Sequence, residues 1–513
     1  MNRPPTPAPP HTLALARQAA SLEARGAFTE AAAVWARAAA SDGAFLPAQL
    51  GLAQAHIRTG RPADALPVLD RLRAQAPGLP AAWLATAVAQ SMLGRHDDAV
   101  EHARRAVALA PAVPAAHLGL GDVLRQAGRL EAASDAYRHA VALAPDDPEA
   151  NAKAAVIARL ARRLDDAEAM LRKALARAPG HPYAQVNLAT LLLERGRIEE
   201  GEAMLDAASA TANLPPDARS EIADARSMLA ERASLAAPLA AARSSDDPAP
   251  LIAGLRALRR PDTIDRALVD DLERIASGLA ASDGSGASFA SGAPASSAWF
   301  AIEAHHNVLP TRDAGAIARS VSLFAHPERR SGDADLDVLA YARAVASATS
   351  SPPDDRDPIA LEGWLRLRHA QIVAHRPEIG PGMVKLINNV VGTAVHVPRT
   401  APGQIAATLE AVVEIASRVP GGAPRAVFLY MALLEMHVFA DANGRVVRLA
   451  LNRWLASAGS FPYLRVAESE ARLLARARAS GDLRPVIECI GGGSRYAAEL
   501  DRDWAAREAA TRS

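Results

Sequence analysis

Small residues recur along the first part of the chain at a fixed spacing of 34 positions. One position of this period carries glycine in every unit but one, where Arg162 stands: Gly26, Gly60, Gly94, Gly128 and Gly196. The positions seven before, five after and twelve after it carry alanine almost throughout. The position seventeen after it carries Pro77, Pro111, Pro145 and Pro179. Several positions that keep one phase indicate a repeated structural unit.

Each unit fits a pair of helices joined by a tight turn. Glycine allows the turn after the first helix, small residues let the two helices approach closely, and proline ends the second helix. The pattern resembles the tetratricopeptide repeat and predicts about six units over residues 13–213. Such an array stacks into a solenoid with a concave binding face, which implies a protein partner. Trp35 and Tyr137 share one position of the period, and we expect both in the core.

The rest of the chain is predicted to be helical but lacks the period. Residues 214–280 keep a helical pattern punctuated by prolines, which predicts connecting helices. Residues 281–298 are rich in glycine, serine and alanine, which predicts a flexible linker between the array and the C-terminal part of the chain. A second helical domain is expected over residues 299–493, with a charged C-terminal helix after it over residues 494–513. The fold class is therefore all-α, in two parts.

The polar segment His437–Arg448 lies between two apolar helical patterns. Asn443 and Gly444 open the second helix, where the first amides and the helix dipole favour anions. Glycine also lets the backbone come close to a phosphate. Arg445 and Arg448 are three residues apart, so they project from one helix face and add positive charge. These four residues predict a phosphate-binding site.

Two further residues of this segment can supply chemistry at a bound phosphate. Asp441 offers a carboxylate suited to Mg²⁺, the ion that commonly accompanies polyphosphates. His437 ends the first helix, and a neutral imidazole there can deprotonate a hydroxyl that attacks phosphorus. Phe439 is expected to point inward and hold the loop. The segment therefore combines an anion site, a metal ligand and a general base.

The segment closely resembles the signature of the Fic (filamentation induced by cAMP) family, His-Pro-Phe-x-Asp/Glu-Gly-Asn-Gly-Arg-x-x-Arg. It matches the signature at His437, Phe439, Asp441, Asn443, Gly444, Arg445 and Arg448.

This resemblance covers about 200 residues from Trp299 onward. It implies a helical domain with a small β-hairpin flap that transfers AMP from ATP to a protein hydroxyl. It also implies that His437 is the base and that Asp441 holds Mg²⁺. By the same resemblance, Asn443, Gly444 and Arg445 cradle the phosphates and Arg448 binds the terminal phosphate.

Two residues depart from the signature. Val438 replaces a proline, which relaxes the loop, and Ala442 replaces a glycine beside the anion site. The Cβ of Ala442 disfavours a left-handed backbone and crowds a phosphate, so the transferred group stays open. The alternatives are UMP, or phosphocholine from a CDP-choline-like donor. A catalytically degenerate repeat scaffold is a further alternative, against which the retained His437, Asp441 and both arginines argue.

Two segments upstream also resemble parts of Fic proteins. Residues 388–402 form the one β-like stretch, and an exposed hairpin edge can align a target segment by adding a strand. The residues expected to dock the target there are Val390, Val391, Gly392, Thr393 and Val395. Ala301-Ile302-Glu303 resembles the inhibitory helix of many Fic proteins. That resemblance implies that Glu303 pairs with Arg448 and restrains the enzyme, or orients a water molecule that removes AMP.

The bulk composition limits the classes of partner. Lys plus Arg equals Asp plus Glu, 57 against 57, so net charge does not favour nucleic acid or a membrane surface. The single Cys489 cannot form an internal disulfide. Residues 1–12 are rich in proline, are expected to be disordered and lack a secretory signal, and no apolar stretch is long enough to span a bilayer. We expect a cytoplasmic protein, while export as a bacterial effector and a homodimer are both compatible with the sequence.

Overall fold

The computed structural model describes residues 9–161, 163–211, 214, 216–258, 263–280, 288–309, 313–348, 353–385, 400–465 and 470–512. Within these ranges the regular elements are helices, and one isolated antiparallel bridge joins Ser291 to Ser460. None of these helices is long and apolar enough to cross a lipid bilayer. The chain forms two compact units, the first running to Leu191 and the second containing most of the chain from Leu192 onward.

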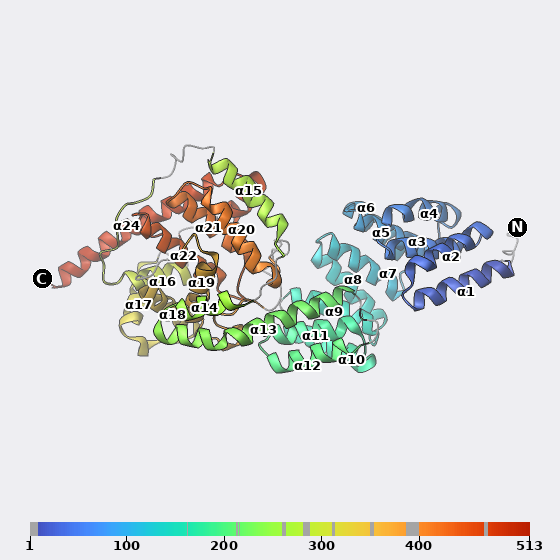
Figure 1. Ribbon diagram of the computed structural model, residues 1–513, viewed down its shortest axis with the longest axis horizontal. Helices are drawn as coiled ribbons and strands as arrows, with labels where there is room; N and C mark the ends of the chain where they lie inside the picture. The colour runs from blue at the N-terminus through green and yellow to red at the C-terminus, as the bar shows by residue number, and fades with distance from the viewer. Residues whose placement is uncertain are drawn as a thin grey trace. The chain divides into compact units, whose positions relative to one another are not determined.

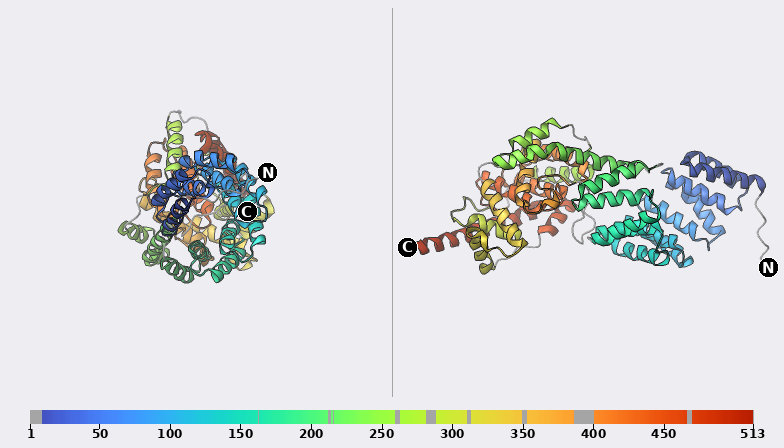
Figure 2. Two further views of the ribbon diagram at one scale, coloured as in Figure 1. Left: turned by 90° about the vertical axis from the view of Figure 1, so that its right-hand side faces the viewer. Right: turned by 90° about the horizontal axis from the view of Figure 1, so that it is seen from below.

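The first unit is a stack of helix pairs in which each helix packs against the next along the chain (Figure 1). Figure 2 shows the same stack, coloured blue to teal, from two further directions. The helices are α1 (Pro10–Ala24), α2 (Phe28–Ser41), α3 (Leu46–Arg58), α4 (Pro62–Gln75), α5 (Pro80–Met92), α6 (His96–Leu109), α7 (Pro114–Gln126), α8 (Leu130–Leu143), α9 (Pro148–Leu160), α10 (Leu164–Arg177) and α11 (Pro182–Glu194).

The periodic glycines end the first helix of each pair in a left-handed conformation. Their φ angles lie between 72° and 76°. A Cβ added at Gly26, Gly60 or Gly94 would meet no atom within 4 Å, so the backbone conformation, not space, requires glycine. The residue after each glycine donates a backbone hydrogen bond to a carbonyl five residues earlier, as Arg61 does to His56 at 2.9 Å. This is the Schellman arrangement that satisfies the last carbonyls of a helix.

A side chain at a second position of the 34-residue period stabilises the loop between successive helix pairs through a hydrogen bond. In five units a side-chain N–H near the start of the first helix donates to a loop carbonyl six residues earlier. The five donors and acceptors are Gln49 to Gly43, Trp83 to Pro77, His117 to Pro111, Asn151 to Pro145 and Gln185 to Pro179, at 2.6–2.9 Å. The residue types differ but all carry an N–H donor, so this position repeats in chemistry and not in identity along the array.

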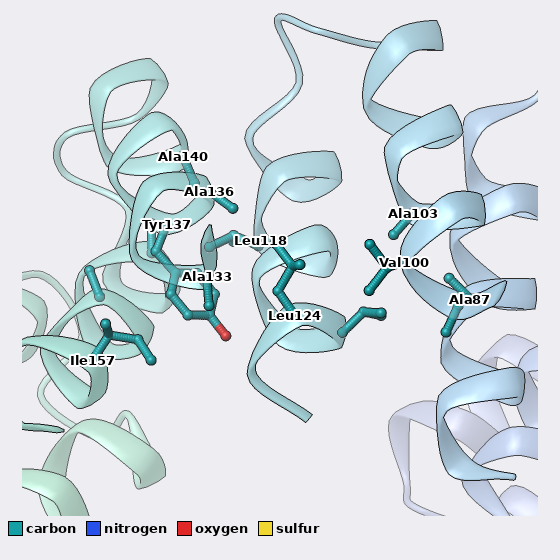
Figure 3. Packing of buried hydrophobic residues seen from close by; sticks show 14 residues of the cluster. Ala87, Val100, Ala103, Leu118, Leu124, Ala133, Ala136, Tyr137, Ala140 and Ile157 are labelled. Atoms are coloured by element: carbon teal, nitrogen blue, oxygen red, sulfur yellow. The ribbon is translucent and has the colours of Figure 1, made fainter. Parts of the chain in front are cut away.

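The core of the array confirms the expected burial of Trp35 and Tyr137, which are 8% and 1% exposed. Figure 3 shows the Tyr137 ring among Ala133, Leu118 and Ile157. The Tyr137 hydroxyl donates to Asp122 Oδ1 at 2.7 Å, so the polar end of the ring is satisfied. Each aromatic ring packs against a glycine of the neighbouring helix. A Cβ at Gly121 would lie 2.4 Å from Tyr137 Cε1, and Gly51 faces Trp35 in the same way.

The second unit is a bundle of helices that surrounds the apolar helices α21 and α22 (Figure 1). Its helices are α12 (Ile198–Ser209), α13 (Pro216–Ser245), α14 (Ala249–Ala257), α15 (Arg266–Ala280), α16 (Trp299–Val308), α17 (Ala314–Ala325), η1 (Pro327–Arg329), α18 (Asp333–Ser347), α19 (Pro358–Ile372), η3 (Pro377–Ile379), η4 (Pro402–Gln404), α20 (Ile405–Ser417), α21 (Ala423–Met436), α22 (Asn443–Ser457), α23 (Glu470–Ser480) and α24 (Arg484–Arg512).

The helices that the sequence predicts as connectors belong to the core of this unit. Arg366 of α19 is 1% exposed and forms ion pairs with Glu362 and with Glu231 of α13. Leu251 and Leu255 of α14 are buried against the same region. Buried ion pairs of this kind need both partners, because a lone buried charge is costly. The α13–α14 segment is therefore held rigidly on α19.

The predicted linker over residues 281–298 is wrong for the part that the structure describes, residues 288–298. The backbone N–H groups of Ala295 and Ser296 donate to the Asp501 carboxylate at 2.8 and 3.1 Å. Ser296 and Ser297 also donate to Glu508. A glycine- and serine-rich composition removes apolar contacts, but it leaves backbone donors that distant carboxylates can bind. Residues 281–287 lie outside the described part of the chain.

The predicted boundary at residues 493–494 is also wrong, because α24 continues through it without a break. Three glycines, Gly491, Gly492 and Gly493, lie inside this helix. A Cβ at Gly493 would lie 2.5 Å from the Tyr463 ring. Glycine is present here for close packing and does not end the helix, although its helix propensity is low.

Gly121→Val tests the packing of the array core. The added side chain must displace the Tyr137 ring, so we expect the free energy of unfolding to fall by about 1–3 kcal/mol. Chemical denaturation of the full chain, monitored by circular dichroism, measures the change. The control is Gly43→Val, since a Cβ there meets nothing within 4 Å. Equal effects of the two substitutions would contradict the packing role.

Candidate functional site

The segment His437–Arg448 forms a loop between α21 and α22. His437 follows α21 in a left-handed conformation (φ 51°, ψ 62°), which ends that helix. Its Nδ1 lies 3.1 Å from the carbonyl oxygen of Leu434. A carbonyl only accepts hydrogen bonds, so Nδ1 carries a proton, and in the neutral ring Nε2 carries the lone pair. This is the tautomer that a base acting through Nε2 requires.

The side chain of Asn443 holds the loop closed. Its Oδ1 accepts from the Phe439 N–H, and its Nδ2 donates to the Phe439 carbonyl, both at 2.8 Å. Asn443 is 3% exposed, so both bonds are shielded from water. The amide side chain thereby holds the backbone through both its oxygen and its nitrogen, so the backbone N–H of Asn443 is the group best placed for the predicted phosphate contact.

His369 of α19 supports the loop and was not singled out by the sequence. Its ring stacks on Phe439, with the ring centroids 4.0 Å apart and the planes 4° from parallel. Burial lowers the pKa of His369 to about 3, so the ring is neutral. Its Nδ1 accepts from the Gly382 N–H at 2.9 Å. A single histidine in a helical pattern gives no signal for this role, because its partner Phe439 is distant in the chain.

The start of α22 presents unsatisfied amides. The N–H groups of Asn443 and Gly444 have no acceptor among the described residues, whereas those of Arg445 and Val446 donate to the Ala442 carbonyl. The first N–H groups of a helix lack intrahelical partners and carry the positive end of the dipole. The arrangement fits an anion at this helix end.

Ala442 adopts the left-handed conformation that its Cβ disfavours, with φ 60° and ψ 10°. The backbone therefore keeps the geometry that a glycine would take, at a cost of about 1–2 kcal/mol. The Ala442 N–H donates to Asp441 Oδ1 at 2.6 Å, and this bond helps to hold the strained turn.

Asp441 lies at the tip of the loop and is bound by an arginine that the sequence did not point to. Its Oδ2 accepts from Arg376 at 2.7 Å. Burial alone would raise the pKa of Asp441, but the Ala442 N–H and the guanidinium of Arg376 lower it below its usual value. The carboxylate is ionised at neutral pH. The described residues contain no group of three or more side chains arranged to hold a metal.

The two predicted phosphate arginines point to different elements. Arg445 pairs with Asp337 of α18 at 2.6 Å, and His375 lies 3.0 Å from the same Asp337 oxygen. Arg448 is 8% exposed and donates to the Asn307 carbonyl at the end of α16. A Cβ at Gly444 would lie 3.1 Å from Arg448 Nη1, so this glycine makes room for the guanidinium.

Glu303 of α16 is fully buried and bonded on both oxygens. Asn452 Nδ2 donates to Oε1 at 2.8 Å, while Trp299 Nε1 and Arg453 Nη2 donate to Oε2 at 2.9 and 3.2 Å. The ion-pair partner of Glu303 is therefore Arg453, and the predicted pairing with Arg448 is wrong. Arg448 and Arg453 lie five residues apart on α22, so they leave the helix in different directions.

The predicted flap residues lie outside the described part of the chain, which resumes at Thr400 after Lys385. They are Val390, Val391, Gly392, Thr393 and Val395. The last described residue before this gap is tied to the loop, because the Lys385 N–H donates to the Val438 carbonyl at 3.1 Å.

A family model described as tetratricopeptide repeat matches residues 22–89 and 158–229, and a second model of that description matches residues 84–148. The N-terminal region is an array of tetratricopeptide repeats. The helix pairs of the first unit, with their periodic glycines, occupy most of these residues, and the match continues into α12 and the start of α13. Repeats of this kind are protein-interaction structures, which is the class of partner that the sequence predicts.

Solved structures of other repeat proteins match part of the chain. TTC0263, a thermophilic tetratricopeptide protein of Thermus thermophilus, is 25% identical, with 36% of this chain and 99% of its own covered and a TM-score of 0.34. MamA is 21% identical, with coverages of 31% and 93% and a TM-score of 0.26. YrrB, a repeat protein with an unusual peptide-binding site, is 18% identical, with coverages of 35% and 92% and a TM-score of 0.27. No curated protein matches the sequence.

Ala442→Gly is expected to stabilise the protein. Glycine adopts a left-handed backbone without the Cβ penalty, so the free energy of unfolding should rise by about 1 kcal/mol. Thermal unfolding of the full chain measures the shift. Ala440→Gly is the matched control, because Ala440 has no positive φ and gains nothing from glycine. A loss of stability in Ala442→Gly would show that the turn is not strained.

Glu303→Gln tests the buried network. It leaves the Arg453 guanidinium uncompensated at 9% exposure, so we expect a loss of about 3–5 kcal/mol in the free energy of unfolding. Chemical denaturation measures it against Glu410→Gln, which changes an exposed carboxylate of α20. An unchanged stability in Glu303→Gln would mean that the ion pair contributes nothing to the fold.

Proposed function

We propose that this protein is a Fic-type protein adenylyltransferase that transfers AMP from ATP to a hydroxyl side chain of a target protein. The observation that carries the proposal is the juxtaposition of a histidine in the Nδ1–H tautomer with a helix start whose first two amides lack acceptors within the described residues. Both belong to one loop of a dozen residues, held by Asn443 and stacked on His369. The proposal also rests on the resemblance of this loop to the Fic signature.

In the proposed reaction the target hydroxyl attacks the α-phosphorus of ATP. His437 Nε2 takes the hydroxyl proton as the new oxygen–phosphorus bond forms, and the bond from the α-phosphorus to the bridging oxygen breaks. Pyrophosphate leaves with the electron pair of that bond. The hydrogen bond from His437 Nδ1 to Leu434 keeps the imidazole oriented and supports the positive charge that it gains.

The proposed phosphate ligands are the backbone amides of Asn443 and Gly444 with the side chains of Arg445 and Arg448. In the structure Arg445 is engaged by the Asp337 carboxylate, an anion that occupies the place of a phosphate oxygen on this guanidinium. A bound nucleotide would exchange this contact for one to phosphate. Such exchange costs little net energy, because one pairing of the guanidinium with an anion replaces another.

Asp441 fits the role of Mg²⁺ ligand in part. It is ionised, half-exposed and located at the loop tip, but it must release Arg376 to bind a cation. Mg²⁺, when bound with the nucleotide, would neutralise charge on the phosphates. Arg376 then becomes available as a further cation near the loop.

By resemblance, we propose that Glu303 restrains the enzyme. Because Glu303 is paired with Arg453 in the structure, this restraint requires a rearrangement of side chains. To act on Arg448, Glu303 would have to leave Arg453 and Asn452. The Glu303→Gln protein separates the two roles, since higher auto-modification indicates restraint and lower stability alone indicates packing.

The repeat array is proposed to select the protein target, which the transferase loop then modifies.

A different donor is the second candidate, and Ala442 is the observation that favours it. The Cβ of a left-handed Ala442 lies beside the anion site, where the signature has glycine. The alternatives are UMP transfer, or phosphocholine transfer from CDP-choline.

Incorporation assays test the proposal and name the donor. The full chain is incubated with Mg²⁺, a cell lysate and each labelled donor in turn: ATP, UTP, GTP, CTP or CDP-choline. We expect label on protein from ATP and a loss of at least about 100-fold in His437→Ala, because general-base catalysis contributes 10²–10⁴-fold. The matched control is His326→Ala, which removes an exposed histidine outside the loop.

Three results would contradict the proposal. Label from CDP-choline or UTP alone would mean that the donor is not ATP. Label that persists in His437→Ala would mean that His437 is not the base. The absence of label with every donor would leave a repeat scaffold without transferase activity.

A further inference from the structure

A cavity of the second unit lies along one face of α18, and its lining includes no residue of the loop His437–Arg448. It has a volume of about 380 Å³ and is bounded by the last turn of α13, the residue after η1, α18 and the end of α19. Its lining residues are Arg243, Arg330, Leu336, Leu339, Ala340, Arg343, Ala344, Ser347, Gln371, Ala374 and His375.

Three arginines give this cavity its charge. Arg243, Arg330 and Arg343 come from three separate segments, and none forms an ion pair or side-chain hydrogen bond within the described part of the chain. The lining contains no aspartate or glutamate among the described residues. Like charges that converge without counterions are unfavourable, so the cavity fits an anionic occupant.

Two carboxylates near the cavity are already paired with other arginines. Asp335 of α18 accepts from Arg319 at 2.7 Å. Asp246, just beyond α13, accepts from Arg368 at 2.7 Å. The positive charge of the cavity is therefore not balanced by these two side chains around it.

The size and the walls of the cavity indicate the class of ligand. Small-molecule pockets have volumes of about 300–1,000 Å³, and this cavity falls at the lower end. Guanidinium groups bind phosphate oxygens through paired hydrogen bonds and are preferred for that purpose over other cations. Leu336, Leu339 and Ala340 supply an apolar wall for the remainder of a small organic phosphate.

We propose that the cavity formed by Arg243, Arg330 and Arg343 binds a small phosphate-bearing molecule. This site is separate from the loop His437–Arg448 and does not depend on transferase activity there. It adjoins the loop through one residue, since His375 lines the cavity and also contacts Asp337, the partner of Arg445.

Isothermal titration calorimetry of the full chain tests the proposal. The probes are inorganic phosphate and glycerol 3-phosphate at low ionic strength, with glycerol as the uncharged control. Arg330→Gln and Arg343→Gln each remove one guanidinium, and we expect each to weaken phosphate binding by about tenfold or more. Both side chains are exposed, so the substitutions leave the fold intact, which circular dichroism checks.

Two further variants locate the site. Arg329→Gln changes the adjacent exposed arginine, which does not line the cavity, and should bind as the parent does. Arg445→Gln removes the loop arginine and should also retain binding at the cavity. The proposal is overturned if neither phosphate binds, if Arg329→Gln weakens binding as much as Arg330→Gln, or if Arg445→Gln alone abolishes it. The last result would assign phosphate binding to the loop and leave the proposed transferase site standing.

Discussion

The two hydrogen bonds between the Asn443 side chain and the backbone of Phe439 determine the geometry of the candidate site. They join the start of α22 to the middle of the loop, and they do so inside the protein, where water does not compete. With Phe439 fixed against His369, His437 and the open amides of α22 are held at the two ends of one rigid turn. The left-handed conformations of His437 and Ala442 are the cost of making that turn so short.

The surroundings of this turn are dominated by charge. Arg376, Arg445 and Arg453 each pair with a carboxylate, and these carboxylates come from three different parts of the second unit. The pairs differ in burial, because Glu303 is fully enclosed while Asp441 is about half-exposed. The enclosed pair serves packing, since an unpaired charge there would be costly. The more exposed pairs can exchange partners with an incoming anion or cation, because water solvates the charged side chains both when they are paired and when they are separated.

The sequence predicts the periodic features well because the signals are local. Each of these features restricts the residue type at one position: a left-handed turn favours glycine, a helix end favours proline, and a close helix contact favours a small residue. Features that depend on distant partners could not be predicted. Residues 288–298 are ordered by Asp501 and Glu508, which lie more than 200 positions away. The choice of Arg453 over Arg448 as the partner of Glu303 depends on how α16 is oriented against α22, and residue spacing carries no information about that orientation.

The hydrogen bond that closes each loop of the array joins two residues only six positions apart, as Asn151 and Pro145 are. The Schellman bonds at the periodic glycines are equally local. Because these turn and loop bonds are local, gene duplication or deletion of one 34-residue block would preserve each turn and loop that remains. The number of repeats in the array can thus change over evolution by whole units, with no change to the loop His437–Arg448.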